Sequence, residues 1–299
     1  MILPNILGKE FECINKISRS LPSLGLGDDC AIIAGKGKKL VISTDYFVEG
    51  VHFDTAYFKL EQIGERCSEA AISDIAAMGA RPLYLLLSLS VPKTYLIQKL
   101  VKGIKTSLDR NKIKLIGGDT TKSNTMFLNI TVIGETSKPI KRNGAKPGDL
   151  IYITSYTGLS AAGLYAINND IKGFNILKKT HKLQTAKIKE GLRLNSIATA
   201  MIDISDGLAS ELYHLAYASK CDMIIEQLPI HKELITLCKK AKLDPIDFVL
   251  YGGEDYELLY TIDPRFKDKA IGIKIGLVTG RNKNPSIEGI DLKRGFRHF

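Results

Sequence analysis

The sequence predicts an α/β fold of the α+β two-domain kind, and three observations support it. Apolar, β-branched runs alternate with helical patterns along the 299 residues. A hydrophobic content of 44% with 25% charged residues is typical of a chain that buries a core. A turn-rich connection at 137–149, which contains Pro147 and Gly148, separates two alternating series. We therefore expect a mixed-sheet N-terminal α/β domain at 1–137 and an α/β C-terminal domain at 138–299.

In the first unit, four runs have the apolar, β-branched character of strands. The last of them, MFLNITVIGE, alternates apolar and polar residues, which predicts a half-buried strand. One helical pattern is closed by Gly79 with Pro82 just beyond, the usual end of a helix, and a second follows Pro92. The predicted strands are 39–44, 83–91, 114–118 and 126–135, and the predicted helices are 57–78 and 92–110.

The second unit begins with the strand-like run LIYIT and repeats the alternation. A Lys-rich stretch at 170–182 is predicted to be an exposed loop within it. The predicted strands are 150–154, 222–227, 256–262 and 271–278, and the predicted helices are 159–169, 184–199, 207–219 and 231–242.

The chain is basic, with 42 Lys and Arg against 32 Asp and Glu and a formal charge of +10. A basic nucleic-acid-binding protein is therefore the alternative that is not an enzyme. The basic clusters lack the interleaved aromatic residues of a base-stacking platform, so a solvated Lys-rich surface is the better interpretation. Such a field would also attract an anionic small substrate. We expect no nucleic-acid partner.

Cysteine usage and hydropathy indicate a reduced, cytoplasmic protein. The five cysteines are odd in number and never form a CxxC pair, which argues against a disulfide framework and a zinc site. The longest strongly apolar run, 83–91, is far shorter than the roughly 20 residues of a membrane span. The opening MILPNILGKE lacks the regions of a signal peptide. We expect no membrane association.

Carboxylates recur beside Gly, Ser or Thr in segments that contain no Lys or Arg. Five such segments are GLGDDCA (25–31), STDYFVEGVHFD (43–54), GGDTT (117–121), IDISDG (202–207) and GGEDYE (252–257). Asp74 lies in a helix of small residues, where an unpaired buried carboxylate would be costly and no base lies within a helical turn. Each acid alone fits a cap or a turn. Together they predict a site for metal ions.

Local context separates these acids. Asp45 and Asp119 are expected at the carboxyl ends of strands, where α/β proteins commonly bind ligands. Asp206 fits the N-cap of the helix that follows it, whereas Asp203 lies between two isoleucines and has no such role.

The residue types favour magnesium and phosphoryl transfer. Carboxylates with Ser and Thr hydroxyls suit Mg²⁺, and no His/Cys cluster suggests zinc. The P-loop motif and the protein-kinase motifs are absent, and GLGDDC lacks the third glycine of a dinucleotide fingerprint. If ATP is used, its phosphates are expected to be held through metal ions.

Eight motifs in order resemble those of the thiamine-monophosphate kinase family, in the superfamily that includes aminoimidazole-ribonucleotide synthetase. They span nearly the whole chain and read GLGDDCA, STDYFVEGVHF, ISDIAAMGARP, LIGGDTT, GAKPGD, IDISDGL, GGEDYEL and GFRHF. The resemblance implies transfer of the γ-phosphoryl group of ATP to thiamine monophosphate, which gives thiamine diphosphate. It also implies a homodimer whose N-terminal domains together form a barrel. Aminoimidazole-ribonucleotide synthetase remains the enzymatic alternative.

The resemblance also implies roles for individual residues. The Asp29 of the adjacent acid pair is the expected ligand, and Asp28 is left as a turn-shaping or supporting carboxylate. Without the motifs, His52, Arg142 and Phe296 would be read as core or surface residues. The implied Mg²⁺ ligands are Asp29, Ser43, Thr44, Asp45, Asp74, Asp119, Asp203 and Asp206; the ATP contacts are Gly118, Asp119, Arg142 and Ser205; the substrate contacts are His52, Glu254 and Phe296.

One segment departs from the family pattern. The family usually has a Pro- and Arg-containing segment before a helix of the second domain, whereas KKTHKLQTAKIKEG (178–191) has no proline and Lys187 as its nearest base. The expected mechanism is direct in-line transfer without a general base, because a phosphate monoester, with a second pKa near ~6, is already largely a dianion at neutral pH.

Overall fold

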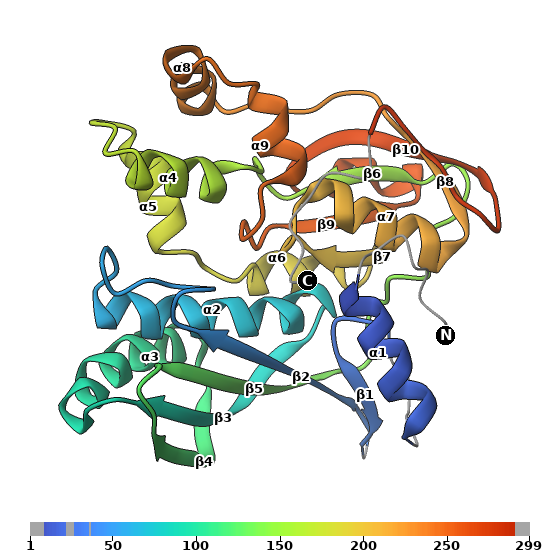
Figure 1. The fold of residues 1–299 in the computed structure, drawn as a ribbon. Coiled ribbons are helices and arrows are strands. Elements are labelled where there is room, and N and C mark those ends of the chain that lie inside the picture. Colours follow the sequence, from blue (N-terminus) through green and yellow to red (C-terminus); the bar gives the residue numbers. More distant parts are fainter. Residues whose placement is uncertain (1–8, 22–26, 36, 291–299) are drawn as a thin grey trace.

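The computed structural model describes residues 9–21, 27–35 and 37–290, which form two β-sheets with helices packed around them (Figure 1). Phe296, a predicted substrate contact, lies outside the described residues. Helix α1 (Lys9–Ser20) precedes the first sheet. The arrangement confirms the predicted mixed α/β fold, with the first sheet formed before residue 137 and the second after it.

The first sheet has five strands in the order β1-β2-β5-β3-β4. Strands β3 and β4 are parallel, and the other pairs are antiparallel, so the sheet is mixed as predicted. Because β1 and β4 are its two edges, the sheet of one chain is open and is not a closed barrel. The strands are β1 (Ala31–Ala34), β2 (Lys39–Val48), β3 (Arg81–Val91), β4 (Lys114–Lys122) and β5 (Phe127–Thr136).

Helices α2 (Leu60–Ala77) and α3 (Ile97–Asn111) cover one face of this sheet, and a short 3₁₀ turn, Thr94–Leu96, leads into α3 (Figure 1). The two helices touch backbone to backbone through two glycines. A Cβ added at Gly103 would lie 1.9 Å from the Glu61 carbonyl oxygen, and one at Gly64 would lie 2.1 Å from the Leu100 carbonyl oxygen. No side chain fits at either position, so glycine is required there for the helices to approach this closely.

The second sheet has six strands in the order β11-β8-β10-β6-β9-β7. Helices pack around it, with α7 beside the sheet and α4, α5, α8 and α9 farther out (Figure 1). A 3₁₀ helix at Pro264–Lys269 joins β9 to β10. The strands are β6 (Leu150–Ile153), β7 (Ala198–Asp203), β8 (Cys221–Ile225), β9 (Leu258–Ile262), β10 (Ile273–Arg281) and β11 (Ile287–Glu288), and the helices are α4 (Leu159–Asn168), α5 (Asn175–Lys182), α6 (Ile188–Leu194), α7 (Leu208–Ser219), α8 (Lys232–Ala241) and α9 (Pro245–Tyr251).

An apolar cluster lies between the two sheets, and α2 is at its centre. The Ala76 and Ala77 side chains of α2 are fully buried in one cluster with Met201 of β7 and Tyr260 of β9. A Cβ at Gly191 of α6 would lie 2.2 Å from the Ala76 carbonyl oxygen. Helix α2 is therefore buried on opposite sides, between the first sheet and the second half of the chain.

Two predictions about secondary structure are wrong. The stretch 170–182 is not a loop throughout, because α5 forms within it and buries Leu177 and His181, four residues apart on one face. The predicted helix 184–199 is reduced to α6, and its last two residues, Ala198 and Thr199, belong to β7, which pairs with β9. Intrinsic helix propensity is a weak preference, and sheet pairing overrides it here. Helices α1 and α9 and strands β1 and β11 have no counterpart in the prediction, and β7 has none beyond residue 199.

Within the described residues, no helix combines the length and the apolarity that a membrane crossing requires.

Candidate active site

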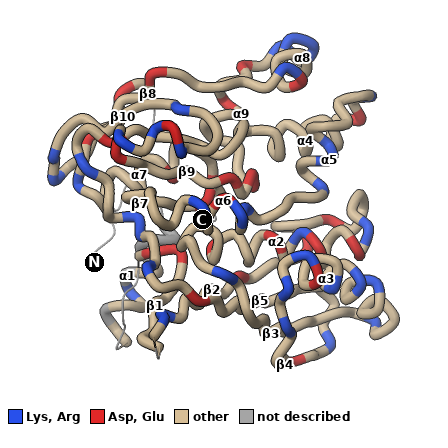
Figure 2. The backbone as a smooth tube through the Cα atoms, turned by 180° about the vertical axis from the view of Figure 1, so that it is seen from behind, with Lys and Arg blue, Asp and Glu red and all other residues tan. Residues whose placement is uncertain are grey.

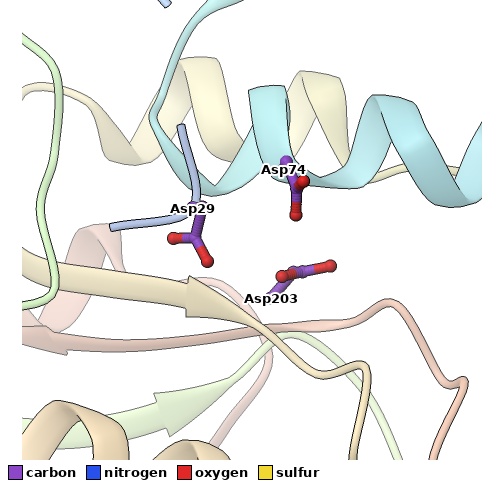
Figure 3. A group of neighbouring side chains, drawn as sticks. All are labelled: Asp29, Asp74 and Asp203. Carbon is purple, nitrogen blue, oxygen red and sulfur yellow. The ribbon is translucent and has the colours of Figure 1, made fainter. Parts of the chain in front are cut away.

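Three carboxylates from distant segments meet between the two sheets (Figure 3). Asp29 lies in the turn before β1, Asp74 near the end of α2, and Asp203 at the last position of β7. One carboxylate oxygen of each lies within 4.8 Å of those of the other two. Figure 3 shows the three side chains directed toward one another. The acid cluster, as we call these three residues, offers hard oxygen ligands on three sides of a small space.

Asp29 and Asp203 of the acid cluster are buried and Asp74 is half-buried, and this governs their electrostatics. The Asp29 side chain has 0% exposure, and Asp203 is 4% exposed. Burial, followed by repulsion from neighbouring acids, raises the pKa of Asp74 well above its usual value and that of Asp203 to about 7. The Asp29 Oδ2 atom is buried with no hydrogen-bond partner among the described residues. A cation between these oxygens would supply the missing partner and the missing countercharge.

Strand β2 adds residues to both sides of the first sheet. The Ser43 hydroxyl donates a hydrogen bond to Asp74 Oδ2, and Asp45 lines the same pocket as Asp74. Burial raises the pKa of Asp45 to about 6. Thr44 points to the opposite face, where its hydroxyl is 2.9 Å from that of Thr131, because successive strand residues alternate. Asp45 is inside β2 and not at its end, which corrects the prediction.

Asp28 and Asp29 bind different parts of the same arginine. The Arg142 guanidinium donates to Asp29 Oδ1 from Nε at 3.2 Å and from a terminal nitrogen at 2.5 Å. Its backbone N–H donates to Asp28 Oδ1 at 2.8 Å. Burial opposes the charge of Arg142, but the neighbouring Asp29 raises its pKa on balance. Asp29 therefore binds the side chain of Arg142, and Asp28 binds its backbone.

A pocket of about 470 Å³ includes two of the three residues of the acid cluster in its wall, Asp74 and Asp203, together with Asp45 and Asp206. Asp29 does not line it. Aromatic and aliphatic residues of β2, α4, α9 and the loops around them also line the pocket, namely Phe47, Val51, Ala161, Leu164, Tyr251 and Tyr256. The pocket therefore offers a ligand both cation-binding oxygens and apolar surface.

Three further predicted residues lie on this pocket: His52, Ser205 and Glu254. His52 Nδ1 accepts a hydrogen bond from the Val48 N–H at 3.1 Å, and its ring packs edge-on against Phe47. The Glu254 N–H donates to the Ser205 carbonyl oxygen at 2.6 Å. Glu254 has a φ of +63°, a left-handed conformation that is uncommon outside glycine. This turn directs Glu254 toward the pocket.

Two predicted residues, Gly118 and Asp119, are not brought to the pocket within this chain. Both are inside β4, which is exposed along its whole length, so the prediction that Asp119 follows a strand is wrong. Asp119 pairs with Ser88, and Ser88 pairs with Asn129, whose amide donates to the Thr44 hydroxyl. Residues paired across strands share a face, so Asp119 and Thr44 lie on the face opposite Ser43.

The predicted cap role of Asp206 is also corrected. The N-cap of α7 is Gly207, with φ of +113° and no side-chain cap hydrogen bond. Asp206 instead lines the pocket, and its backbone N–H donates to Glu211 Oε1 at 3.2 Å. Glu211 is 3% exposed, and burial raises its pKa well above the usual value. A single Glu in an amphipathic helix carries no signal in the sequence that would have identified it.

The sequence did not identify two further sets of residues at or behind the pocket wall. Tyr251 and Tyr256 flank the GGED sequence, and their proximity to that motif was the available signal. Arg66 of α2 is buried and forms an ion pair with Glu254, 2.8 Å between Nη2 and Oε2. It lies outside every acid-only segment, because those segments were selected for having no base.

The fold and the acid-lined pocket define a class, the AIR synthase related proteins, whose N-terminal domain model matches residues 27–136. Thiamine-monophosphate kinase of Bacillus subtilis is 34% identical over 97% of this chain and 99% of its own length. That of Buchnera aphidicola subsp. Schizaphis graminum is 36% identical over 97% of this chain and 98% of its own. A solved structure of AaThiL complexed with AMPPCP and TMP superimposes with a TM-score of 0.90, at 31% identity, over 100% of this chain and 99% of the other.

The chain belongs to the thiamine-monophosphate kinase family.

Proposed function

We propose that this protein is a cytoplasmic enzyme that transfers the γ-phosphoryl group of ATP to thiamine monophosphate and so forms thiamine diphosphate. The observation that carries the proposal is the pocket, whose wall contains both carboxylates and apolar, aromatic residues. Such a lining suits a phosphate held through metal ions and a heteroaromatic body. The AaThiL neighbour, complexed with AMPPCP and TMP, supports both halves of this assignment.

We propose that the acid cluster holds several Mg²⁺ ions, with Ser43, Asp45 and Asp206 as further oxygen donors. The fit rests on the donor set, all carboxylates and a hydroxyl, and on the buried, unpartnered Oδ2 of Asp29. When bound, such ions would neutralise the phosphates and reduce the repulsion between donor and acceptor. The chain's own contribution is to keep the carboxylates fixed and away from bulk water, since Asp74 and Asp29 are anchored by Ser43 and Arg142.

Arg142 and Ser205 are proposed to contact the nucleotide, and His52, Glu254 and Phe296 the thiamine body. The phosphate of thiamine monophosphate needs no general base, because its second pKa is near ~6. We propose direct in-line transfer to this oxygen, with no phosphorylated enzyme. Accumulation of a phosphoprotein during turnover would contradict that step.

The decisive assay mixes purified protein with ATP, Mg²⁺ and thiamine monophosphate, and follows thiamine diphosphate and ADP by chromatography. We expect both products in equal amounts, and none when EDTA removes the metal. Aminoimidazole ribonucleotide made from its formyl-amidine precursor, with no thiamine diphosphate, would instead favour the synthetase alternative.

Nucleic-acid binding is the weaker alternative. Lys and Arg residues are spread over α3, α5, α8 and several loops and do not form one stripe (Figure 2). A nucleic-acid binder would retain DNA or RNA on a filter in a strongly salt-sensitive way. We expect no such retention at physiological salt.

We propose a homodimer in which a second copy covers the open face of the first sheet. Large apolar residues are exposed on the edge strand β4, with 56% exposure for Leu115 and 52% for Ile116. Tyr46 of β2, 51% exposed, lies on the open face, because it pairs with Asn129. An exposed, apolar edge strand favours association. The open face carries Thr44 and Asp119, so covering it would surround these two predicted site residues with protein. We propose further that 1–137 is the dimerising domain and 138–299 the domain that completes each site.

Sedimentation velocity tests the dimer. The wild-type protein should sediment at about twice the chain mass of 32.9 kDa. Ile116→Asp places a charge on the exposed edge strand β4 and should give a monomer, because a buried unpaired charge opposes association. Ile235→Asp is the control, since Ile235 is an exposed residue of α8, away from this sheet. A wild-type monomer at all concentrations would reject the proposed dimer.

A further inference from the structure

Arg66 is a buried cation placed behind a residue of the pocket wall. Its side chain is 3% exposed, whereas that of Glu254, its ion-pair partner, is 32% exposed. Arg66 comes from α2, in the first half of the chain, and Glu254 from the loop between α9 and β9. The pocket is lined by Glu254 and not by Arg66, so the guanidinium contacts the carboxylate from the protein side.

The other contacts of Arg66 hold it in one orientation. Its Nη1 donates to the His181 carbonyl oxygen and, at 3.1 Å, to Gln184 Oε1. The guanidinium carbon lies 5.6 Å from the centre of the Phe58 ring. Burial alone would lower the pKa of Arg66, but the charge of Glu254 raises it on balance. The cation is therefore retained in the interior by a single carboxylate.

Glu254 is held through its backbone as well. The Gln184 amide that contacts Arg66 also donates to the Glu254 carbonyl oxygen, and the Glu254 N–H donates to Ser205. Gln184 lies in the segment 178–191, where this chain departs from the family pattern. The result is a clamp of three residues, Arg66, Gln184 and Glu254, from three separate parts of the chain.

We propose that Arg66 is a positioning residue that fixes the Glu254 carboxylate for substrate binding. The inference rests on the proposed function and deepens it. Arg66 holds the carboxylate at Oε2, and Glu254 lines the pocket, so the carboxylate is fixed at the pocket wall. A fixed carboxylate oxygen accepts strongly from a ring amino or N–H donor. A Glu side chain that is free to rotate loses rotamer entropy when a ligand binds to it. Because Arg66 already holds Glu254 in one orientation, this entropy is lost on folding and not on binding.

The matched control is Arg110 of α3, which also pairs with acids of α2. Its guanidinium contacts Glu69 at 2.7 Å and Glu65 at 2.5 Å, and neither acid lines the pocket. Arg66→Gln and Arg110→Gln each remove one guanidinium that lies at helix α2. Only the first removes the support of a pocket carboxylate.

The experiment measures thiamine diphosphate formation by wild-type protein, R66Q, R110Q, E254Q and the double variant R66Q/E254Q. We expect R66Q to raise the KM for thiamine monophosphate about tenfold or more, as for the loss of one buried ion pair. Its KM for ATP should stay within about twofold of wild type, and R66K should recover part of the loss. In the E254Q background, R66Q should have little further effect, because the two residues act as one unit.

Two results would overturn the inference: a KM for thiamine monophosphate in R66Q no different from that in R110Q, or the same R66Q effect with and without Glu254. If R66Q does not fold in a thermal melt, Q184A and R66K take its place in both backgrounds. A loss coupled to Glu254 then supports the inference, and additive losses reject it. A wild-type protein that makes no thiamine diphosphate rejects the proposed function itself, whereas an active wild type with an uncoupled R66Q rejects only the role of Arg66.

Discussion

Asp74→Asn is expected to reduce turnover by roughly 10³-fold, the scale of losing a major electrostatic contact to the transferred group. The metal-free variant should also melt at a higher temperature than wild type. Burial and neighbouring acids raise the pKa of Asp74, so its ionised form destabilises the folded protein at neutral pH. Asparagine removes that charge, and its amide oxygen can still accept the hydrogen bond from Ser43.

Both quantities can be measured on one preparation, by product chromatography with Mg²⁺ and by thermal unfolding in EDTA. Asp109→Asn is the control, because Asp109 is an exposed carboxylate of α3 that pairs with Lys105. It should change neither quantity appreciably, as is usual for an exposed ion pair. Near-normal turnover in Asp74→Asn would show that this carboxylate is only structural.

The second large effect is a difference between adjacent residues. Asp29→Asn should lower turnover by roughly 10²-fold or more, because it weakens both the acid cluster and the anchor of Arg142. Asp28→Asn should cost less than about tenfold, the value of one neutral hydrogen bond. Asp28 accepts from the Arg142 backbone N–H, and an asparagine side chain retains an acceptor oxygen there.

This comparison needs no external control, since each variant changes one carboxylate of the same turn into its amide. Rates with saturating ATP and thiamine monophosphate, and the Mg²⁺ concentration giving half the maximal rate, should be recorded together. We expect that Mg²⁺ concentration to rise in Asp29→Asn and to stay near wild type in Asp28→Asn. Equal losses in the two variants would contradict the division of roles between them.

The sequence allowed the acid cluster to be anticipated because its members share a local signature. Asp29, Asp74 and Asp203 each lie among small or apolar residues without a base, and folding brings them together. Their convergence could not be derived from spacing, since they come from a turn, a helix and a strand end. The resemblance to a family supplied that connection, and the buried geometry now gives it a physical reason.

Other features were set by contacts that no local pattern encodes. Asp45 and Asp119 were expected at strand ends, because polar residues follow apolar runs there, yet pairing with β5 and β3 extends both strands beyond them. Arg66 lies in an ordinary helical pattern in the sequence. Its proposed role depends on Glu254, which is 188 positions later in the chain. Strand β7 was not predicted, and its first two residues were included in the predicted helix 184–199, because pairing with β9 is a long-range contact that the local pattern does not contain.

Helix α2 has one more consequence, for the engineering of this protein. From Arg66 to Ala77 every residue is buried except Asp74, which faces the pocket. An ordinary surface helix tolerates substitution with a period of 3.6 residues, since one side meets water. This half of α2 has no such side. A library that randomises it should therefore yield an unbroken run of intolerant positions, and variation aimed at new substrates belongs in α4 and α9, which form the apolar wall.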